Sequence, residues 1–390
     1  MQSGNVIPVP GGTARLVTRA ELGGVPRWRH VFDLRCKDHR YYEILETTLD
    51  NEFEHRYLVL EDASGNVRGV QPLFFLRQNL TEGVTGAVRS AIDAVRAKFP
   101  RFLTMRVMMV GCAAGEGHLG CAPEDEPFVV ESLHASLRTI AKQHNASLVI
   151  LKDFPAKYRG VLQRFAGNGY ARVPSMPYTR LALKYADFEE YLKTLGSATR
   201  KNLRRKFRQT EQTAKIDLEV VTDITPYVDE IYPLYLQVHD RSALKFENLT
   251  KEYFRDISAQ MPERTRFFLW RKDGRIIAFS FCLIHDGTLY DEILGMDYTV
   301  ALDLHLYYIT IRDILTWALK EGLQFYYSSP LNYDPKLHLG CHLAPLDLYV
   351  QHTVSALNPL FRTAVKYLEP TRHDKVLRQF PNARELMADS

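Results

Sequence analysis

The feature that most constrains the fold of this chain is a pattern that occurs twice along it. In each half, two apolar, strand-like runs flank a tight turn, over residues 57–75 in the first half and 267–281 in the second. Gly65 and Gly274 mark the two turns. Apolar runs on either side of such a turn are typical of β-hairpins. The sequence therefore predicts one hairpin at the same stage of each half.

The segments that follow each hairpin also correspond, because a strand, an amphipathic helix and a second strand come in the same order. They span 107–110, 127–145 and 148–151 in the first half, and 290–294, 304–320 and 323–327 in the second. Apolar residues spaced three and four apart indicate the helices, and short apolar runs indicate the strands. Gly322 is placed to end the second helix, since glycine readily adopts positive φ there.

Each half closes with a glycine that lies five residues before a proline, and a last strand follows. The glycines are Gly169 and Gly340, and the strands span 178–183 and 346–350. The interval between hairpin and closing glycine is longer in the first half, which predicts an inserted helix at 84–98. Any α/β chain can give this order by chance, but the equal glycine-to-proline spacing favours duplication.

We therefore predict an α/β protein with mixed sheets, built from two tandem units related by internal duplication. The first domain is expected to cover residues 1–175 with the inserted helix, and the second residues 176–365. A tail is expected at 366–390.

Composition narrows the class of protein. The chain has 390 residues, and 50 basic and 46 acidic residues give a net charge of +4, which excludes a tail-like polycation. No run approaches the roughly 20 apolar residues that span a bilayer, and no secretory signal is recognised. Five dispersed cysteines argue against a disulfide framework. We expect a cytoplasmic protein without a metal centre, because no cysteine–histidine group has a zinc spacing.

The strongest local feature is a basic run between the two units. Seven basic residues fall within 193–208, where no acidic residue occurs. On a helix, Arg200, Arg204 and Arg208 would form one row beside an apolar stripe. Such a row matches phosphate by bidentate hydrogen bonds, which predicts a phosphate-binding face. The alternative is a solvated basic face without a ligand.

Residues 197–208 read Ser-x-x-Arg-x-Asn-Leu-Arg-Arg-x-x-Arg and open the second unit. With the order of elements, the segment 238–241 and the closure at 336–340, this run resembles the FemAB-like acyltransferases. These are bacterial proteins with two tandem GNAT units. The resemblance extends over residues 30–365, which is most of the chain.

The resemblance implies transfer of an acyl or aminoacyl group from acyl-CoA or aminoacyl-tRNA to an amine, without a tightly bound cofactor. Acceptors across the family include cell-wall precursors, sugars and amino acids. We therefore expect a small-molecule or lipid-linked acceptor and no stable nucleic-acid partner. An interfacial helix at 84–98 would allow peripheral membrane contact, but the small apolar residues of this stretch favour an ordinary packed helix. Substrate or phosphate contacts are expected from Arg200, Asn202, Arg204, Arg205, Arg208, Arg241, Tyr333 and Lys336.

The phosphate-binding turn of CoA-dependent GNAT enzymes is absent from its usual place. Such a turn has a Gly-x-Gly pattern at a helix start, where free backbone N–H groups bind anions. The second half has no Gly-x-Gly within 295–303, and the glycine-rich run 111–120 of the first half has Cys112 where a basic or amide residue is expected. Acyl-CoA and aminoacyl-tRNA therefore both remain candidate donors.

Amine acylation needs a base for the ammonium proton and an acid for the leaving group. The strand-like segment 290–298 carries acids and tyrosines at the expected place. Alternation puts Glu292 and Tyr290 on one face of the strand. We predict Glu292 as the base, Asp297 as the next choice and Tyr298 as the acid. The alternative is that these are polar residues at a strand end.

The rival class of protein is a non-catalytic pair of GNAT-like units whose basic helix binds a nucleic acid or an anionic lipid. Convergence of an acid and a tyrosine on the basic face would favour catalysis, whereas burial of Glu292 against another strand would favour the rival.

Overall fold

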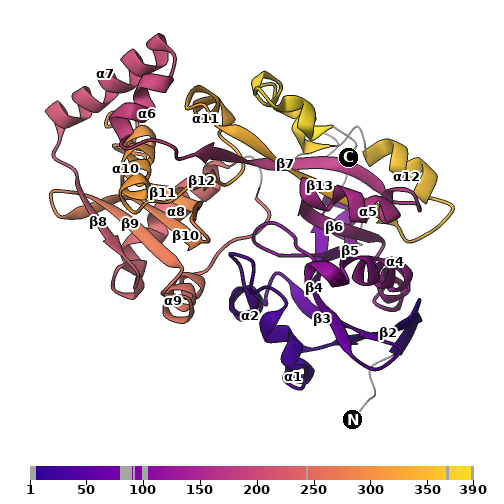
Figure 1. The fold of residues 1–390 in the computed structure, drawn as a ribbon. Coiled ribbons are helices and arrows are strands. Elements are labelled where there is room, and N and C mark those ends of the chain that lie inside the picture. Colours follow the sequence, from indigo (N-terminus) through magenta and orange to yellow (C-terminus); the bar gives the residue numbers. More distant parts are fainter. Residues whose placement is uncertain are drawn as a thin grey trace.

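The computed structural model describes residues 6–79, 90, 93–98, 104–242, 245–365 and 369–387. The predicted inserted helix at 84–98 lies largely outside this described part. The described strands form one 13-stranded mixed sheet that runs through both halves of the molecule (Figure 1).

The first half supplies the sheet from one edge to its middle. Its strands are β1 (Val6–Val9), β2 (Gly12–Val17), β3 (Glu54–Asp62), β4 (Val67–Asn79), β5 (Thr104–Val110), β6 (Leu148–Pro155) and β7 (Ala171–Ala182). Its helices are α1 (Arg19–Leu22), α2 (His39–Thr48), α4 (Glu126–Gln143) and α5 (Arg159–Ala166).

The second half repeats this order with more helices at its start. Its strands are β8 (Asp217–Val221), β9 (Thr265–Lys272), β10 (Arg275–His285), β11 (Thr288–Met296), β12 (Phe325–Ser328) and β13 (His342–His352). Its helices are α6 (Phe188–Thr194), α7 (Ser197–Thr213), α8 (Val228–Arg241), α9 (Lys251–Gln260), α10 (Leu306–Lys320), α11 (Tyr333–His338) and α12 (Asn358–Val365).

The predicted mixed α/β architecture of two related units is confirmed. Hairpins β3–β4 and β9–β10 occupy the two predicted places. In the second hairpin, Lys272 pairs with Arg275, and the intervening Asp273 and Gly274 both have positive φ, at 51° and 80°. Tight two-residue hairpin turns require this conformation. Gly322 follows α10 with a φ of 70°, as expected for a helix-ending glycine.

The closing strands of the two halves change places. The sheet order is β1-β2-β3-β4-β5-β6-β13-β7-β12-β11-β10-β9-β8. Strand β7 of the first half pairs with β12 of the second, and β13 of the second half pairs with β6 of the first. The predicted domain limit at residue 175 falls within β7, at the centre of this exchange.

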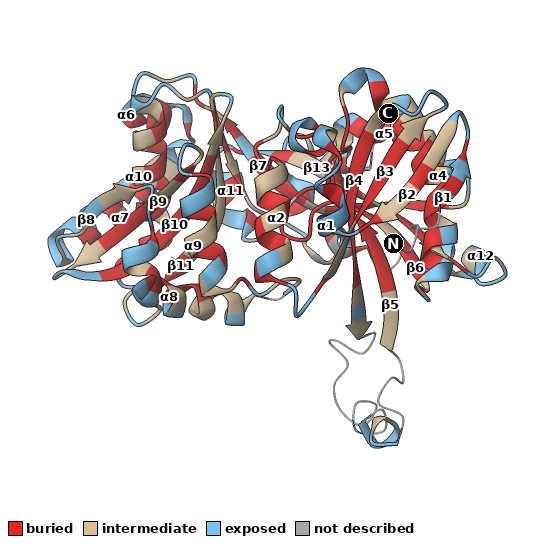
Figure 2. Ribbon diagram, turned by 90° about the horizontal axis from the view of Figure 1, so that it is seen from below, coloured by how far each residue is buried: buried red, intermediate tan, exposed pale blue. Residues whose placement is uncertain are grey.

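Two parallel strand pairs position the site described below. Val107–Val110 of β5 pairs with Leu148–Leu151 of β6, and Thr288–Asp291 of β11 pairs with Phe325–Ser328 of β12. Beyond Val110 in the first pair and Asp291 in the second, the two strands of each pair diverge. Buried residues concentrate on the strands, and exposed residues on the outer sides of the helices (Figure 2).

The last described segment packs on the body of the protein. Leu377, Phe380 and Leu386 are buried in the core of the second half. The Asn382 side chain both accepts from and donates to the backbone of Leu343, each at 2.9 Å. Among the described helices, none combines the length and apolar character that a membrane span requires.

Candidate functional site

Glu292 lies where β11 begins to diverge from β12. Opposite Phe281 and Cys282 of β10, the register of β11 moves from Ile293 to Asp291, so that Glu292 is an extra residue in the pairing. Such β-bulges redirect a side chain and are common next to active sites. The bulge is in the strand and at the position where the sequence predicted an acidic site residue.

The Glu292 carboxylate meets two side chains from the first half of the chain. Lys37, just before α2, donates from Nζ to Glu292 Oε1 and to Glu116 Oε2, each at 2.7 Å. Tyr178 on β7 donates its hydroxyl to Glu292 Oε2 at 3.2 Å. Lys37 is 1% exposed, and the Glu292 side chain is 9% exposed. We call Lys37, Glu116, Glu292 and Tyr178 the junction cluster.

Aromatic rings and a histidine complete the surroundings of the junction cluster. The Lys37 ammonium lies 5.6 Å from the centroid of the Tyr41 ring and 5.8 Å from that of Tyr178. His118 Nε2 lies 3.4 Å from Glu116 Oε1. Burial lowers the pKa of His118 to about 4, so its ring is neutral at physiological pH.

One ammonium shared by two buried carboxylates separates their pKa values. Burial would raise the pKa of Glu116, but the Lys37 ammonium and the His118 ring together outweigh burial and hold this pKa well below its usual range. Burial raises the pKa of Glu292 above its usual range, although Lys37 opposes this, and the charge of Glu116 adds to the increase. A pair of acids whose environments push their pKa values apart is typical of acid–base sites. Glu292 is the stronger base of the two.

The opposite face of β11 carries a second buried acid that is fully engaged. Asp291 accepts from the hydroxyls of Ser280 and Tyr326, the latter at 2.7 Å. Burial raises the pKa of Asp291. This acid links β10, β11 and β12 and thereby fixes the strand from which Glu292 projects.

Lys336 and Tyr333 are buried contacts of the loop that follows β12. Lys336 Nζ donates to the backbone oxygens of Ser329 and Leu331, and burial lowers its pKa to about 8. The Tyr333 hydroxyl donates to the Pro177 oxygen at 2.8 Å. Both residues hold α11 beside the point of divergence.

Asp297 and Tyr298 form contacts outside the junction cluster. Asp297 is 1% exposed and forms an ion pair with Arg275 at 2.8 Å. It also accepts from the Thr299 hydroxyl at 2.6 Å. The Arg241 guanidinium lies 4.1 Å from the centroid of the Tyr298 ring, at the end of α8. Of the three predicted catalytic residues, the structure brings only Glu292 into the junction cluster.

The predicted basic helix is α7, at the outer end of the second half (Figure 1). Leu203 and Phe207 form the expected apolar stripe, at 2% and 8% exposure. The basic face does not converge on Glu292.

Some of the predicted phosphate contacts of α7 are already engaged within the protein. Arg204 pairs with Glu189 at 2.7 Å, Arg205 bonds to Asn202, and Arg200 donates to the backbone of Lys193 and Leu195. Arg208 is exposed and has no hydrogen bond or ion pair to any residue that the structure describes.

The glycine-rich run 111–120 fills the divergence of β5 and β6 with protein atoms. A Cβ on Gly117 would lie 2.4 Å from the Lys152 oxygen, and one on Gly120 would lie 1.9 Å from the Val70 oxygen. The Gly120 N–H donates to the Gln71 side chain. These glycines are needed for close packing, and their surroundings do not form an open phosphate cradle.

Sequence reasoning missed Lys37, Glu116 and Tyr178. Lys37 and Tyr178 stand in stretches without a recognisable motif, and both reach Glu292 only through long-range contacts. Glu116 had a weak signal, because it is a lone acid between Gly115 and Gly117 in an otherwise apolar run.

The comparisons with known proteins agree with this fold. A family model, FemAB-like, described as peptidoglycan biosynthesis/recognition, matches residues 38–367. The structure is similar to that of FemX, with a TM-score of 0.50 at 11% identity, over 86% of this chain and 96% of that chain. No curated protein matches the sequence.

Two further solved structures are similar in fold. One is L-PGS from Bacillus licheniformis, with a TM-score of 0.48 at 14% identity, over 84% of this chain and 96% of that one. The other is a tandem GNAT protein from the clavulanic acid biosynthesis pathway, with a TM-score of 0.48 at 12% identity, over 87% of this chain and 99% of that one.

Proposed function

Because this chain belongs to the FemAB-like family of peptidoglycan biosynthesis/recognition proteins, we propose that it is an N-acyltransferase that uses Glu292 as its base. One observation carries the proposal. The Glu292 carboxylate projects from a β-bulge at the strand divergence and contacts Lys37 and Tyr178 in a nearly dry environment. A carboxylate with a raised pKa is well suited to accept a proton near neutral pH.

The proposed reaction is a direct attack of the amine on the activated acyl carbon. Glu292 accepts a proton from the acceptor ammonium, and the neutral nitrogen then forms the new C–N bond. The C–S or C–O bond to the donor breaks, and the departing thiolate or alkoxide takes up the second proton, which the nitrogen loses as the amide forms. Lys37 and Tyr178 orient the Glu292 carboxylate, since each bonds to one of its oxygens. No covalent enzyme intermediate is involved.

The donor is proposed to be acyl-CoA or aminoacyl-tRNA, and the acceptor a small-molecule or lipid-linked amine. The exposed basic face of α7 supports a phosphate-bearing donor, because Arg208 is available for bidentate bonds to phosphate. Because protein atoms fill the space around the glycine run 111–120 of the first half, we place the donor site on the second half.

Titration of the protein with acetyl-CoA, a long-chain acyl-CoA and aminoacyl-tRNA tests the donor class. Arg208→Ala is expected to weaken binding of the true donor about tenfold, because a charged hydrogen bond to phosphate is lost. Lys215→Ala provides a matched control, since Lys215 is also an exposed cation but lies beyond α7. Equal donor affinity of Arg208→Ala and the wild type would exclude the basic face of α7 as the donor site. Failure of all three donors to bind would exclude the acyltransferase activity.

The pH dependence of the reaction tests the assignment of the base. In Glu116→Gln, the pKa of Glu292 is expected to fall, because the charge of Glu116 raises it in the wild type. A base is active when deprotonated, so the acid limb of kcat/KM should move to lower pH. Profiles of kcat/KM against pH for wild type and variant measure this shift. A limb that stays in place or moves to higher pH would contradict the role of Glu292.

A second candidate function is anion binding without catalysis. Two observations favour it: the exposed cations of α7 lie away from the junction cluster, and the Glu292 side chain is buried, at 9% exposure. In that case a nucleic acid or an anionic lipid would bind as well to Glu292→Gln as to the wild type, and no donor would be consumed.

A further inference from the structure

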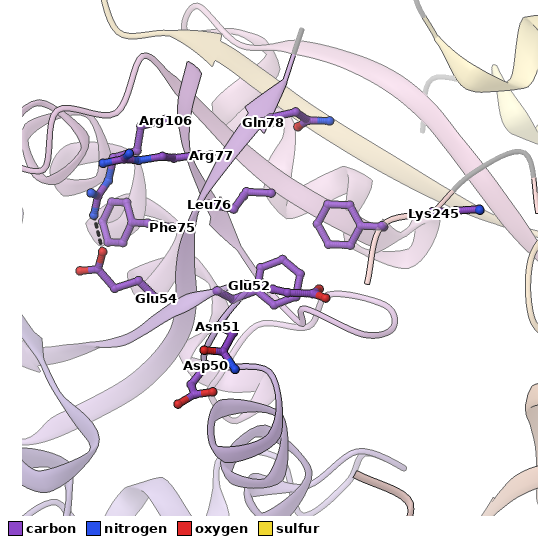
Figure 3. Close-up of a pocket in the computed structure, with 12 residues that line it drawn as sticks. Asp50, Asn51, Glu52, Glu54, Phe75, Leu76, Arg77, Gln78, Arg106 and Lys245 are labelled. Atoms are coloured by element: carbon purple, nitrogen blue, oxygen red, sulfur yellow. Dashed lines mark hydrogen bonds and ion pairs between the residues drawn. The ribbon is translucent and has the colours of Figure 1, made fainter. Parts of the chain in front are cut away.

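A pocket of ≈ 560 Å³ opens on the first half, at the ends of β3, β4 and β5. This volume is within the range of about 300–1,000 Å³ that is usual for ligand pockets. The turn before β3 forms one wall, the end of β4 with Arg106 forms another, and Lys245 and Phe246 of the second half complete it (Figure 3). The mechanism proposed above does not use this pocket.

Two arginines on one wall have few carboxylates near them among the residues that the structure describes. Arg77 and Arg106 are direct partners in the β4–β5 register, so their side chains project from the same face of the sheet. Like charges at such positions destabilise a sheet. The nearby Glu54 bonds to Arg106 through one oxygen and to Arg56, at 2.9 Å, through the other. Arg77 has no hydrogen bond or ion pair to any described residue, so the wall favours an added anion.

The opposite wall is acidic. Figure 3 shows Asp50, Asn51 and Glu52 across the pocket from Arg77 and Arg106. Asp50 and Glu52 are exposed at the rim, and Glu52 accepts one bond, from the Asn248 backbone at 3.3 Å. A purely anionic ligand would be repelled by this wall, whereas a ligand that also carries an ammonium group would be attracted to it.

Between the two walls the pocket is aromatic. The rings of Phe53 and Phe246 are stacked with centroids 5.6 Å apart. Cζ of Arg106 lies 5.1 Å from the centroid of the Phe75 ring. Phe246 also lies 4.9 Å from Lys152 Nζ, which donates to the oxygen of Gly115, next to Glu116. The pocket is therefore separated from the junction cluster by the side chains of Phe246 and Lys152.

We propose that this pocket binds an amphoteric ligand, with a carboxylate or phosphate held by Arg77 and Arg106 and an ammonium group held by Glu52. An apolar body of the ligand packs on Phe53 and Phe246. The pocket does not open on Glu292, so the ligand is bound outside the proposed reaction centre, and the inference does not depend on the proposed function. Binding itself does not require catalysis.

Calorimetry on the full chain tests the pocket directly. 6-Aminohexanoate and 6-aminohexyl phosphate serve as probes for the carboxylate and phosphate sources. Their controls are hexanoate, hexyl phosphate and hexylamine, each of which lacks one charge. At least one amphoteric probe is expected to bind, and loss of either charge should weaken binding about tenfold or more. Equal binding of a singly charged control, or no binding of either probe, would overturn the proposal.

Substitutions locate the site. Arg77→Ala and Glu52→Gln are each expected to weaken probe binding about tenfold, and since both side chains are exposed, the fold should be retained. Arg378→Ala, at an exposed position of the C-terminal segment, should leave the affinity unchanged. Unchanged affinity in Arg77→Ala would place the probe elsewhere and overturn the proposal.

The same probe separates this inference from the proposed function. Binding that persists in Glu292→Gln supports the pocket independently of catalysis. Acylation of other amines, without binding of either probe, would overturn the pocket while leaving Glu292 as the base.

Discussion

Glu292→Gln is expected to lower kcat by about 10²–10⁴-fold, which is the usual contribution of a positioned general base. The amide keeps the size of the side chain and its bond with Tyr178, but it does not accept the proton of an ammonium group. Lys37 retains Glu116 as its counter-ion at 2.7 Å, so the fold should tolerate the change. Steady-state kinetics with the donor identified by titration measures the effect.

Two comparisons make this result specific to the base. Glu219→Gln on β8 removes an acid that pairs with Arg271 near the edge of the sheet, and it should change kcat little. Urea denaturation should show that Glu292→Gln is folded under assay conditions. If kcat of folded Glu292→Gln stays within about threefold of the wild type, the proton is removed by another group.

Lys37→Met is expected to reduce the free energy of unfolding by about 3–5 kcal/mol, the usual cost of removing one partner of a buried ion pair. Methionine fills a similar volume but leaves Glu116 and Glu292 without their shared cation. Lys37 is 1% exposed, so water cannot replace the ammonium without a rearrangement of the junction cluster. Denaturant unfolding at neutral pH measures the loss.

The pH dependence of this difference has a defined sign. The lowered pKa of Glu116 stabilises the wild type above the unfolded pKa of that residue, and this contribution disappears as the pH falls. The raised pKa of Glu292 acts in the opposite direction and flattens the wild-type profile. In Lys37→Met both carboxylates are buried without a cation, so protonation relieves the strain. The stability difference should therefore shrink towards acid pH, and a loss below about 1 kcal/mol at neutral pH would contradict the account.

Local sequence patterns were sufficient for the repeated hairpins and for the strands and helices that follow them, whereas β1, β2 and β8 were not predicted. The hairpins, α7, α10 and the strand that carries Glu292 all have signals within a few residues, such as the Asp273-Gly274 turn and the stripe of Leu203 and Phe207. These signals depend on side-chain periodicity and turn chemistry, which neighbouring residues determine.

The partners of Glu292 could not be predicted in this way. Lys37 lies 255 residues from Glu292 along the chain, and Tyr178 lies 114 residues away. Their convergence depends on how the two halves join, for which neither segment carries a local signal. The same reason explains why the basic helix was expected near the acid, although its residues contact α6 and the preceding segment.

Because β7 and β13 are exchanged, the two units of this single chain are arranged like the subunits of a domain-swapped dimer. The first half expressed alone would lack β13, which pairs with β6, and the second half alone would lack β7, which pairs with β12. The open edge of β6 or β12 would then be free to pair with other chains. Because Tyr178 stands on an exchanged strand, the chain must complete both units before Glu292 acquires its full set of partners.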